Sequence, residues 1–536
     1  MSISFDAGIE IRLPIEPDAS SAEIVETLLR IPENWLGRTV FAASEGKLTF
    51  AQLREGMLQS AAWLGKRDIR PGDVVAVCLP KCLPAIQWVY GVFACGAIYA
   101  PLQFNGPPSR LNAIITSLRP RLVLTTPEMA GRLAREGDDN RAASEILVAL
   151  TLAAGEIELL ASGLALPVSI PERRPDELTA IYFTSGSTGQ PKGVMWSRRA
   201  MEATVRRTLQ HHHANADDRL ISHIGFHYSP SMDIFYPLFS GCSTFVLTER
   251  ETLVPEQVAT VLERERITMW VSSASLLRLL AEGGGLAQRR LDAVRYVEFM
   301  GEPLAVPVLR RLMAAFPMAR FLNNYGATEA YDIAHYPVPR PLPEDLANVP
   351  LGRPLSNYEF HLRCEDGSEA KDGESGEICV IGPQVMMGYW AEPDQTAARR
   401  IDGRPDSYRT GDFACRDGDG ILRMIGRKDN VVKLHGNRFD LGEVAAVLKK
   451  HPAVREVVAF AIATNAALGD KEVRAAIQVD PALVDNPALL NELRRLCRDS
   501  LPNFARPVRY AMLEAFPLLS SGKIDRKALE QKLSAS

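Results

Sequence analysis

One stretch near the N-terminus decides the class of fold: Pro71-Gly72-Asp73-Val74-Val75-Ala76-Val77-Cys78-Leu79. Its first three residues favour a turn, and the six that follow form a continuous apolar run. Such a run is typical of a strand buried on both faces. A helical segment at 84–95 and a second apolar run at 97–102 come next, and residues 122–124 repeat the theme. This alternation predicts an α/β fold with a largely parallel sheet.

The helix before this stretch has a recognisable start. Thr49 and Gln52 have the spacing of a capping box, in which each side chain accepts the backbone N–H of the other residue. Apolar residues then recur at steps of three and four through residue 64, as on one face of a helix. Ser20 and Glu23 show the same capping spacing before another apolar run. We therefore expect a helix after each pair.

The alternation resumes beyond residue 180 and changes character near residue 350. We expect strands at 220–224, 269–272, 294–300 and 320–323, and helices at 255–264 and 305–316. After residue 350, short β-like runs such as 377–381 are separated by Gly, Asp and Pro turns, which indicates a small β-rich subdomain. Helix, strand, strand and helix then follow at 442–450, 456–463, 472–479 and 487–499.

The predicted architecture is α/β. A large N-terminal body (1–428) holds two α/β subdomains and the small β-rich one. A small, mobile α+β C-terminal domain (429–536) follows it. The charged stretch Gly426-Arg427-Lys428-Asp429 lies at this boundary and suggests a hinge.

Charge and composition exclude several classes of protein. The 536 residues include 61 Lys and Arg against 65 Asp and Glu, a net charge of −4. Hydrophobic residues make up 46% and charged residues 24%, which is ordinary for a globular protein and argues against a disordered or fibrous one. No basic excess exists to drive binding to nucleic acid or to an anionic membrane, so we expect neither partner.

The cysteines and histidines give no metal signature. The eight cysteines are scattered, and none form a C-x-x-C pair. Cys78 and Cys82 have a spacing that suits a metal on a helix, but no second cluster completes a site. We expect buried, reduced thiols. The run His211-His212-His213 has no carboxylate or Cys to complete a ligand set, so we expect a solvated loop there.

Neither a signal peptide nor a membrane span is predicted. Asp6, Glu10 and Glu16 stand where a signal peptide needs an apolar core. The most apolar stretch, 88–102, is shorter than the ~20 residues needed to span a bilayer. We expect a soluble protein of the cytoplasm.

The most informative segment for function is Tyr182-Phe183-Thr184-Ser185-Gly186-Ser187-Thr188-Gly189-Gln190-Pro191-Lys192-Gly193-Val194. Glycines let the backbone approach a ligand and form a nest of N–H donors that suits an anion. Ser and Thr add hydroxyl donors, and Lys192 adds a positive charge. The spacing matches neither the P-loop NTPase motif, because Pro191 takes the place of the second glycine, nor the dinucleotide-binding motif. We predict a phosphate-binding loop, since a plain surface turn does not need so many of these residues together.

With this loop and six further motifs, the sequence resembles the adenylate-forming enzyme superfamily. That superfamily includes adenylation domains of nonribosomal peptide synthetases, D-alanine–carrier protein ligases and acyl-CoA synthetases. The motifs stand in family order and cover about residues 20–530. They are Asn323-Asn324-Tyr325-Gly326-Ala327-Thr328-Glu329, Gly376-Glu377-Ile378 with Gly388-Tyr389-Trp390, Tyr408-Arg409-Thr410-Gly411-Asp412, Gly426-Arg427-Lys428-Asp429, Val432-Lys433-Leu434-His435-Gly436, and Ser521-Gly522-Lys523-Ile524-Asp525-Arg526-Lys527. The resemblance implies a ligase that uses ATP to convert a carboxylic acid to an acyl-adenylate and releases pyrophosphate.

The resemblance gives each motif residue a role that suits its chemistry. The loop and Lys192 would hold the departing pyrophosphate, and Glu329 would hold Mg²⁺, a hard cation that prefers carboxylate oxygens. Lys523 would reach the substrate carboxylate and the α-phosphate, where charge builds in the transition state. Asp412 would accept hydrogen bonds from the ribose hydroxyls, with help from Arg427. The nucleotide-binding set implied is Thr184, Ser185, Gly186, Ser187, Thr188, Gly189, Lys192, Asn324, Tyr325, Gly326, Thr328, Asp412 and Arg427, with Tyr325 against adenine.

The family's second half-reaction is thioester formation. The resemblance implies that the tail rotates about Asp429, withdraws Lys523 and presents the face around Lys433 and Gly436. A thiol then attacks the adenylate through a channel near Gly436. The implied catalytic set is Lys523, Glu329, Thr184 and Lys433. The alternative for Asp429 is that it only caps a turn.

By resemblance, the acid pocket is lined by His227, Tyr228, Ser229, Met232, Val271, Glu298, Met300, Asn324, Asp332 and Ile333. Relatives that activate α-amino acids usually carry Asp in a Phe-Asp-x-Ser motif. This chain has Phe226-His227-Tyr228-Ser229, so His227 or Tyr228 takes the place of that Asp, and neither is an anion.

Two carboxylates, Glu298 and Asp332, remain near the pocket, and a buried carboxylate is costly unless it is paired. We therefore expect an amino acid whose amine is not on the α-carbon, such as a β-amino acid. Two alternatives stay open. The substrate can be a hydroxy, aryl or short acyl acid with no ammonium, or the two carboxylates can face a protein Arg or solvent.

The predicted acyl acceptor is the phosphopantetheine thiol of a separate carrier protein. Residues 432–444 resemble peptide-synthetase adenylation domains more than CoA ligases. No Gly-Gly-x-Ser attachment motif follows Lys523 before Ser536, so we expect a free-standing enzyme. An acyl- or aryl-CoA ligase is the alternative. A catalytically dead binding protein would be expected to have lost Lys523, Glu329 or Asp412, and all three are present.

Overall fold

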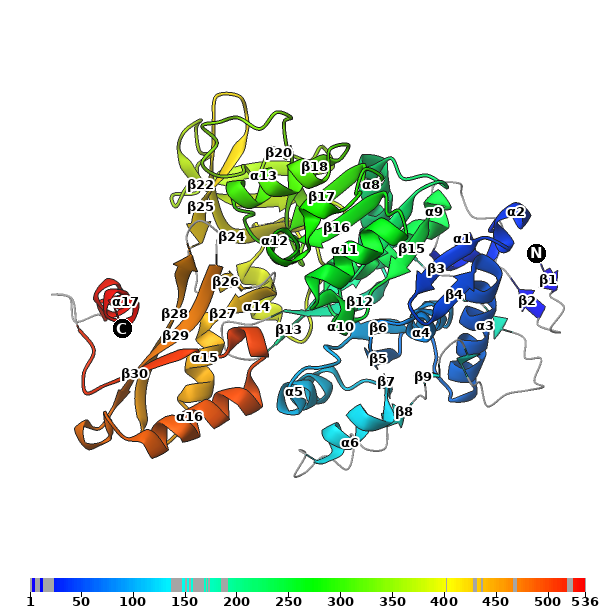
Figure 1. The fold of residues 1–536 in the computed structure, drawn as a ribbon. Coiled ribbons are helices and arrows are strands. Elements are labelled where there is room, and N and C mark those ends of the chain that lie inside the picture. Colours follow the sequence, from blue (N-terminus) through cyan, green and yellow to red (C-terminus); the bar gives the residue numbers. More distant parts are fainter. Residues whose placement is uncertain are drawn as a thin grey trace.

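The structure is a computed structural model, in which two large sheets form the body and a smaller unit follows them (Figure 1). It describes residues 2–4, 10–12, 24–135, 147–149, 152–153, 156–157, 168–169, 171, 174–184, 191–401, 403–427, 431–434, 437–465, 470–517 and 524–535.

The apolar run after Pro71 lies inside a seven-stranded sheet. In order across the sheet, the strands are β23 (Gly388–Tyr389), β13 (Lys192–Ser197), β12 (Leu178–Thr184), β6 (Ile98–Pro101), β5 (Val74–Cys78), β7 (Leu122–Thr125) and β8 (Leu147–Ala149). Strands β12, β6, β5, β7 and β8 run parallel, and all of β5 is buried, as its continuous apolar pattern predicts. Its accompanying helices are α3 (Phe50–Lys66), α4 (Leu83–Ala94), α5 (Pro108–Leu118), α6 (Pro127–Arg135) and α8 (Arg198–His212).

The second sheet has nine strands. Across it lie β20 (Arg353–Pro354), β19 (Tyr331–Pro337), β18 (Arg320–Ala327), β17 (Tyr296–Met300), β16 (Met269–Ser273), β14 (Arg219–Ser222), β15 (Ser243–Val246), β3 (Thr39–Ala43) and β4 (Gly46–Thr49). The strands from β18 to β3 are parallel, and β19, β20 and β4 are antiparallel additions. Helical segments connected with this sheet are α1 (Ile24–Leu29), α2 (Glu33–Leu36), η1 (Ser229–Phe235), α9 (Tyr236–Ser240), α10 (Glu249–Thr252), α11 (Pro255–Arg264), α12 (Ala274–Gly283), η2 (Leu286–Gln288) and α13 (Val306–Ala315).

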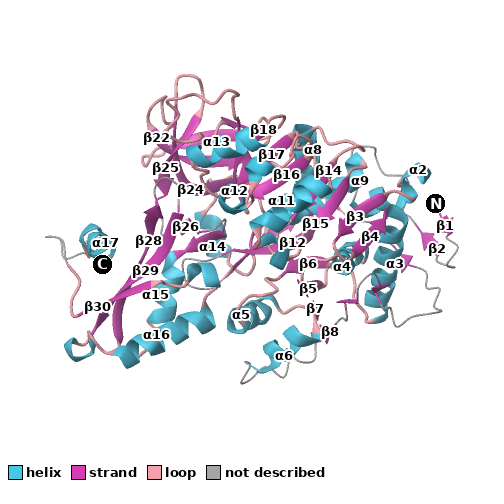
Figure 2. Ribbon diagram, in the orientation of Figure 1, coloured by secondary structure: helices cyan, strands magenta, loops and turns pink. Residues whose placement is uncertain are grey.

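Separate apolar cores explain the layers. The largest core joins side chains of both sheets with those of α3, α4 and α8, so these helices lie between the sheets. The outer face of the nine-stranded sheet packs on α11, α12 and α13, and that of the seven-stranded sheet packs on α5 and α6. Figure 2 shows this alternation of helical and strand layers.

A four-stranded antiparallel sheet completes the body, as the β-rich texture after residue 350 predicts. Its strands are β21 (Glu359–Arg363), β22 (Ser375–Ile381), β24 (Ser407–Arg416) and β25 (Leu422–Arg427), and α14 (Pro393–Ala398) lies between β22 and β24 in sequence. Smaller pieces are β1 (Ser2–Ser4), β2 (Glu10–Arg12) and β11 (Val168–Ser169) in one sheet, and the pair β9 (Leu152–Ala153) and β10 (Glu156–Ile157).

The C-terminal unit has its own sheets and cores. Its elements are the hairpin β26 (Val431–Leu434) and β27 (Asn437–Asp440), α15 (Leu441–Leu448), β28 (Val454–Asn465), β29 (Asp470–Val479), η3 (Pro481–Leu483), α16 (Pro487–Ser500), η4 (Asn503–Ala505), β30 (Arg509–Leu513) and α17 (Arg526–Ala535). The sheet β28-β29-β30 packs on α15 and α16 on one face and on α17 on the other. The proposed hinge residue Asp429 and the boundary at 428/429 lie outside the described residues.

Thr49 and Gln52 form the capping box that opens α3, whereas Ser20 and Glu23 lie outside the described residues. All eight cysteines are free thiols, four buried and four half-buried. Among the described residues, no cluster of His, Cys, Asp or Glu suits a metal ion. In the same part of the chain, no helix has both the length and the apolar character to cross a membrane.

Candidate active site

A cavity of about 310 Å³ lies where the carboxyl edges of the two large sheets meet the C-terminal unit. From the nine-stranded sheet, the ends of β16 (Ser273) and β17 (Met300) and the last part of β18 reach it. From the seven-stranded sheet, the ends of β6 (Pro101) and β12 (Thr184) reach it. The carboxyl edge is where open α/β sheets bind ligands, because the loops that follow the strands gather there.

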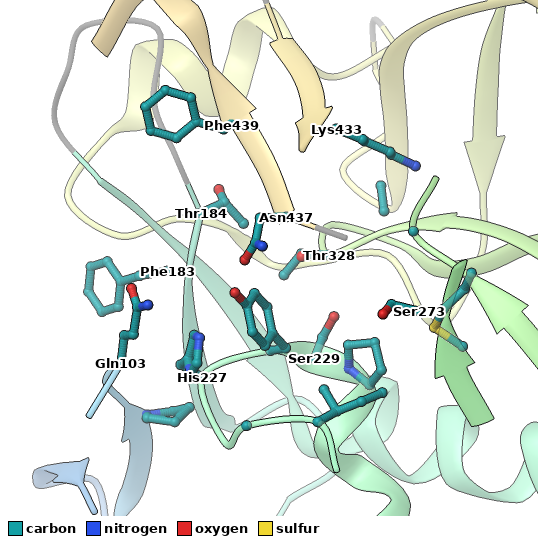
Figure 3. A pocket seen from close by; sticks show the side chains of 18 of the residues that line it. Gln103, Phe183, Thr184, His227, Ser229, Ser273, Thr328, Lys433, Asn437 and Phe439 are labelled. Atoms are coloured by element: carbon teal, nitrogen blue, oxygen red, sulfur yellow. The ribbon is translucent and has the colours of Figure 1, made fainter. Parts of the chain in front are cut away.

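The predicted phosphate loop connects two strands at this cavity. Thr184, the last residue of β12, lines the cavity and pairs with Lys192, the first residue of β13 (Figure 3). The Lys192 Nζ lies 5.6 Å from the centre of the Tyr389 ring. Residues 185–190 between them, which include Ser185, Gly186, Ser187, Thr188 and Gly189, lie outside the described residues.

The turn between β18 and β19 brings a second motif to the cavity. Gly326 is required there, because a Cβ on it would lie 1.8 Å from the carbonyl oxygen of Tyr331. Thr328 lines the cavity, and its carbonyl accepts the Trp196 indole N–H at 3.0 Å. Glu329 is buried, and its Oε1 accepts the Tyr389 hydroxyl at 2.8 Å. The turn is thus fixed by backbone packing and by two hydrogen bonds from aromatic side chains.

Asp412 and Tyr325 meet beside the cavity. The Tyr325 hydroxyl donates to Asp412 Oδ2 at 2.5 Å, and both side chains are buried. Glu377, in the motif before, holds this segment of β24, because its Oε1 accepts the Gly411 N–H at 3.0 Å. Arg427 stands opposite Asp412 in the β24–β25 register.

The C-terminal hairpin covers the cavity from the other side. Figure 3 shows Lys433, Asn437 and Phe439 reaching the cavity opposite His227 and Ser229. The Lys433 Nζ lies 5.8 Å from the centre of the Tyr325 ring. Pro502 and Phe504, which follow α16, complete this wall. Lys523 and Gly436 lie outside the described residues, and α17 lies on the far side of the C-terminal sheet (Figure 1).

Polar contacts hold the C-terminal unit in this orientation. The Ser109 hydroxyl at the start of α5 donates to the carbonyl of Asp499 at 2.9 Å. Arg110 pairs with Glu443, and Arg278 pairs with Asp470.

The cavity is lined by six of the ten residues expected to form the acid pocket: His227, Tyr228, Ser229, Met300, Asn324 and Asp332. The rings of His227 and Tyr228 stack with centres 3.9 Å apart. Burial, with Arg110 adding to it, lowers the pKa of His227 to about 3, so its imidazole is neutral at pH 7. His227, one of the two residues expected in the place of the amino-acid-binding Asp, is therefore uncharged.

The other four residues do not reach the cavity. Met232 and Ile333 are completely buried in the apolar core. Val271 and Glu298 are register neighbours that lie one pleat before the cavity-lining residues of β16 and β17. The cavity reaches only the last residue of each of these strands.

Glu298 belongs to a buried polar network behind the cavity. Its Oε2 lies 2.8 Å from His212 Nε2 and accepts the Tyr296 hydroxyl at 3.1 Å. Asn324 Nδ2 donates to Glu298 Oε1 at 2.7 Å and to Asp332 Oδ1 at 2.6 Å. The two carboxylates therefore share one amide, which separates Glu298 from the cavity.

The two carboxylates titrate in opposite directions. Burial raises the pKa of Asp332 well above its ordinary value, and the charge of Glu298 raises it further. Burial also tends to raise the pKa of Glu298. The His212 imidazole and its hydrogen bond outweigh burial there, so the pKa of Glu298 is lowered.

His212 corrects one expectation from the sequence. The run His211-His212-His213 is not a solvated loop, because α8 continues to His212, whose side chain is 0% exposed. The signal was present in the spacing, since His212 follows the buried Met201, Val205 and Thr208 at helical intervals.

A buried lysine fixes one wall of the cavity. Lys81, two residues before α4, donates to the Ile224 carbonyl at 2.7 Å and pairs with Asp233 at 3.3 Å, and its side chain is only 2% exposed. Burial lowers the pKa of Lys81, against the opposing charge of Asp233. Because Ile224 lines the cavity, Lys81 positions the loop between β14 and η1.

Comparison with known proteins shows the family to which the chain belongs. The family model for AMP-binding enzymes matches residues 30–390, and the model for the AMP-binding enzyme C-terminal domain matches residues 443–523. The chain is 34% identical over 500 residues to phenyloxazoline synthase MbtB of Mycolicibacterium paratuberculosis, which covers 92% of this chain but only 40% of that longer protein. It is 30% identical over 529 residues to an L-proline–[L-prolyl-carrier protein] ligase of Streptomyces coelicolor, covering 94% and 96% of the two chains.

Among solved structures, the amide bond synthetase McbA of Marinactinospora thermotolerans superposes with a TM-score of 0.82. The two chains are 26% identical over 95% of this chain and 99% of that one. The chain thus belongs to the AMP-binding enzyme family. It is an adenylate-forming ligase that uses ATP to activate an acid.

Proposed function

We propose that the acid carries a protonated amine away from its α-carbon, as in a β-amino acid, and that the acyl group passes to the thiol of a carrier protein. One observation carries the substrate proposal. Asp332 is a buried carboxylate that lines the cavity, and no Lys or Arg of the described chain lies within ion-pair distance of it. Its nearest basic group is His335 Nε2 at 3.9 Å, and burial lowers the pKa of that imidazole to about 4. A substrate ammonium would supply the missing charge.

The first half-reaction needs cations and donors around two anions. A carboxylate oxygen attacks the α-phosphorus of ATP, and pyrophosphate leaves. Thr184, Lys192 and the intervening hydroxyl residues would hold the phosphates, and Lys523 would neutralise charge at the α-phosphate. Tyr325 would lie against adenine. Asp412 would accept hydrogen bonds from the ribose hydroxyls, and Arg427 would donate to the ribose oxygens.

The buried carboxylate of Glu329 is a hard oxygen ligand that fits Mg²⁺. When bound, this ion would offset phosphate charge. Glu329 would hold it at the β18–β19 turn.

The orientation of the C-terminal unit supports a second half-reaction on a thiol. The thiol sulfur attacks the acyl carbon, the C–S bond forms, and AMP leaves. Lys433, Asn437 and Phe439 lie at the cavity, which is the face that this step would present. We propose that residues 429–536 rotate about Asp429 between the half-reactions. Similarity to a prolyl-carrier protein ligase favours a carrier over CoA, and ATP and a reduced thiol both fit the cytoplasm.

A screen of acids tests the substrate proposal. Acid-dependent pyrophosphate exchange, confirmed by hydroxamate trapping, would be measured over α-amino, β-amino, aryl and short fatty acids. We expect a β-amino acid to be preferred over its des-amino analogue by about 30-fold or more in kcat/KM, because the analogue leaves a buried carboxylate unpaired. Lys523→Ala is the control, and it should sharply reduce exchange while ATP binding persists. Equal rates with the amine and its analogue would overturn the proposal.

A second assay tests the acceptor. Thioester formation would be followed with CoA, with free phosphopantetheine and with a holo carrier domain. We expect the carrier domain to be the best acceptor. A higher kcat/KM with CoA would identify a CoA ligase instead.

A further inference from the structure

His212 lies outside the loops that line the cavity but contacts the network behind it. It is the last residue of α8, and its side chain and that of Glu298 are 0% and 1% exposed. The Tyr296 hydroxyl shares Oε2 of Glu298 with it. Glu298 therefore has partners on the protein side and needs none from the substrate.

Asn324 transmits this arrangement to the cavity. An ionised carboxylate only accepts hydrogen bonds, so Glu298, whose pKa is lowered, requires the NH₂ group of Asn324 on its side. The amide orientation follows, with Nδ2 on Glu298 Oε1 and Asp332 Oδ1. Oδ1 of Asn324 is buried and accepts no hydrogen bond from the described residues.

We propose that His212 is a positioning residue for substrate selection: it holds Glu298 back from the cavity, fixes the amide of Asn324, and so leaves Asp332 and Asn324 Oδ1 to receive the substrate ammonium. This inference rests on the proposed function. Without His212, Oε2 of Glu298 would keep only the Tyr296 hydroxyl, and the carboxylate would compete for the Asn324 amide. The ammonium would then lose its defined pair of acceptors.

If the role of His212 were purely structural, its replacement would have a different effect. It would lower stability and reduce activity toward every acid alike. A positioning His212 reduces the preference for the amine, because an acid without an ammonium does not use the two acceptors.

The test compares a β-amino acid with its des-amino isostere in pyrophosphate exchange. The variants are His212→Phe, which removes the donor, and His212→Gln, which keeps a neutral N–H donor. His213→Asn is the matched control, because His213 is the exposed neighbour in a left-handed conformation that Asn also adopts. Asp332→Asn reports on the proposed function itself.

We expect His212→Phe to reduce the preference for the amine by about 10-fold or more, which is the range for loss of a buried hydrogen bond to a charged group. The kcat/KM for the isostere should change by less than about threefold. His212→Gln should restore much of the preference, and His213→Asn should keep all of it. If His212→Phe does not fold, a His212→Gln protein with a reduced preference and an unchanged kcat for the isostere supports the same conclusion.

Two outcomes would overturn the inference, and they are distinguishable from failure of the proposed function. Equal losses for both acids in His212→Phe would show a structural role only. If Asp332→Asn abolishes the preference for the amine but both His212 variants retain it, His212 has no role in substrate selection, and the proposed function stands. A wild-type protein with no preference would instead refute the proposed function.

Discussion

The proposed pairing of the buried Asp332 with a substrate ammonium implies that substrate binding depends on pH. Asn324, His335 and the charge of Arg207 also face Asp332. Because its pKa is raised in the free protein, Asp332 is protonated below that pKa, and an ammonium must displace the proton to form an ion pair. We expect kcat/KM for a β-amino acid to rise with pH through this raised pKa.

The des-amino analogue should show a flatter profile in pyrophosphate exchange, and Asp332→Asn should remove the rise. Identical pH profiles for the two acids in the wild-type protein would contradict this assignment.

We expect the lack of a side chain at Gly326 to be important for the stability of the protein. Since a Cβ there would meet the Tyr331 carbonyl at 1.8 Å, Gly326→Ala should lower the free energy of unfolding by about 1–3 kcal/mol or more, as overpacking does. Gly65→Ala is the control, because this exposed position in α3 has nothing within 4 Å and Ala favours helix. Thermal unfolding measures both. An equally stable Gly326→Ala protein would show that the turn can rearrange.

At the level of single residues, the sequence predicts short motifs more easily than it predicts which residues line the pocket. Thr184 and Lys192 lie in one contiguous segment whose composition points to an anion, and Thr328 lies in a motif identified by its resemblance to the family. The fold brings Thr184 and Thr328 to the same cavity. The sequence carries no comparable signal for how far along a strand the cavity extends. Val271 and Glu298 were expected in the pocket, yet the cavity stops at Ser273 and Met300.

At the level of elements, Lys81 connects the loop before α4 to the loop after β14. Lys81→Met should leave Asp233 unpaired and lower the free energy of unfolding by about 3–5 kcal/mol. It should also raise KM for the acid more than KM for ATP, because Ile224 lines the cavity next to His227 and Ser229, which we propose bind the acid. Lys66→Met, at an exposed site, is the control.

Thermal unfolding and steady-state exchange check both effects. The double variant Lys81→Met/Asp233→Asn should recover part of the stability. Equal changes in the two KM values would exclude a role in positioning the acid-side loop.

Most elements follow from periodicity, and the exception is informative. Residues 255–264 form α11 as predicted, and the expected strand at 377–381 lies in β22. The end of α8 was missed because three consecutive histidines suggest solvent or metal. Their environment depends on strands β17 and β19, which come much later in the sequence.

At the level of the whole molecule, the C-terminal unit is held by contacts that we propose serve the thiol step. Arg278→Glu should break the pair with Asp470 and slow thioester formation by roughly 2–5-fold, typical of a partly exposed ion pair. Pyrophosphate exchange should change little. The double variant Arg278→Glu/Asp470→Arg should restore the rate, and equal loss in both half-reactions would contradict the assignment.

The position of the C-terminal unit against the body could not be predicted from the sequence. The two α/β layers, the β-rich subdomain and the α+β tail follow from local patterns. The contribution of Phe439, Pro502 and Phe504 to the cavity depends on how the tail packs against α5, and no local pattern encodes that contact.

The central claim is that Asp332 pairs with an ammonium of the substrate. The direct measurement is a calorimetric binding cycle that compares a β-amino acid and its des-amino isostere on the wild-type protein and on Asp332→Asn. We predict a coupling free energy of about 2 kcal/mol or more between the ammonium and Asp332, as close charge pairs show in such cycles. A coupling free energy near zero would contradict the account.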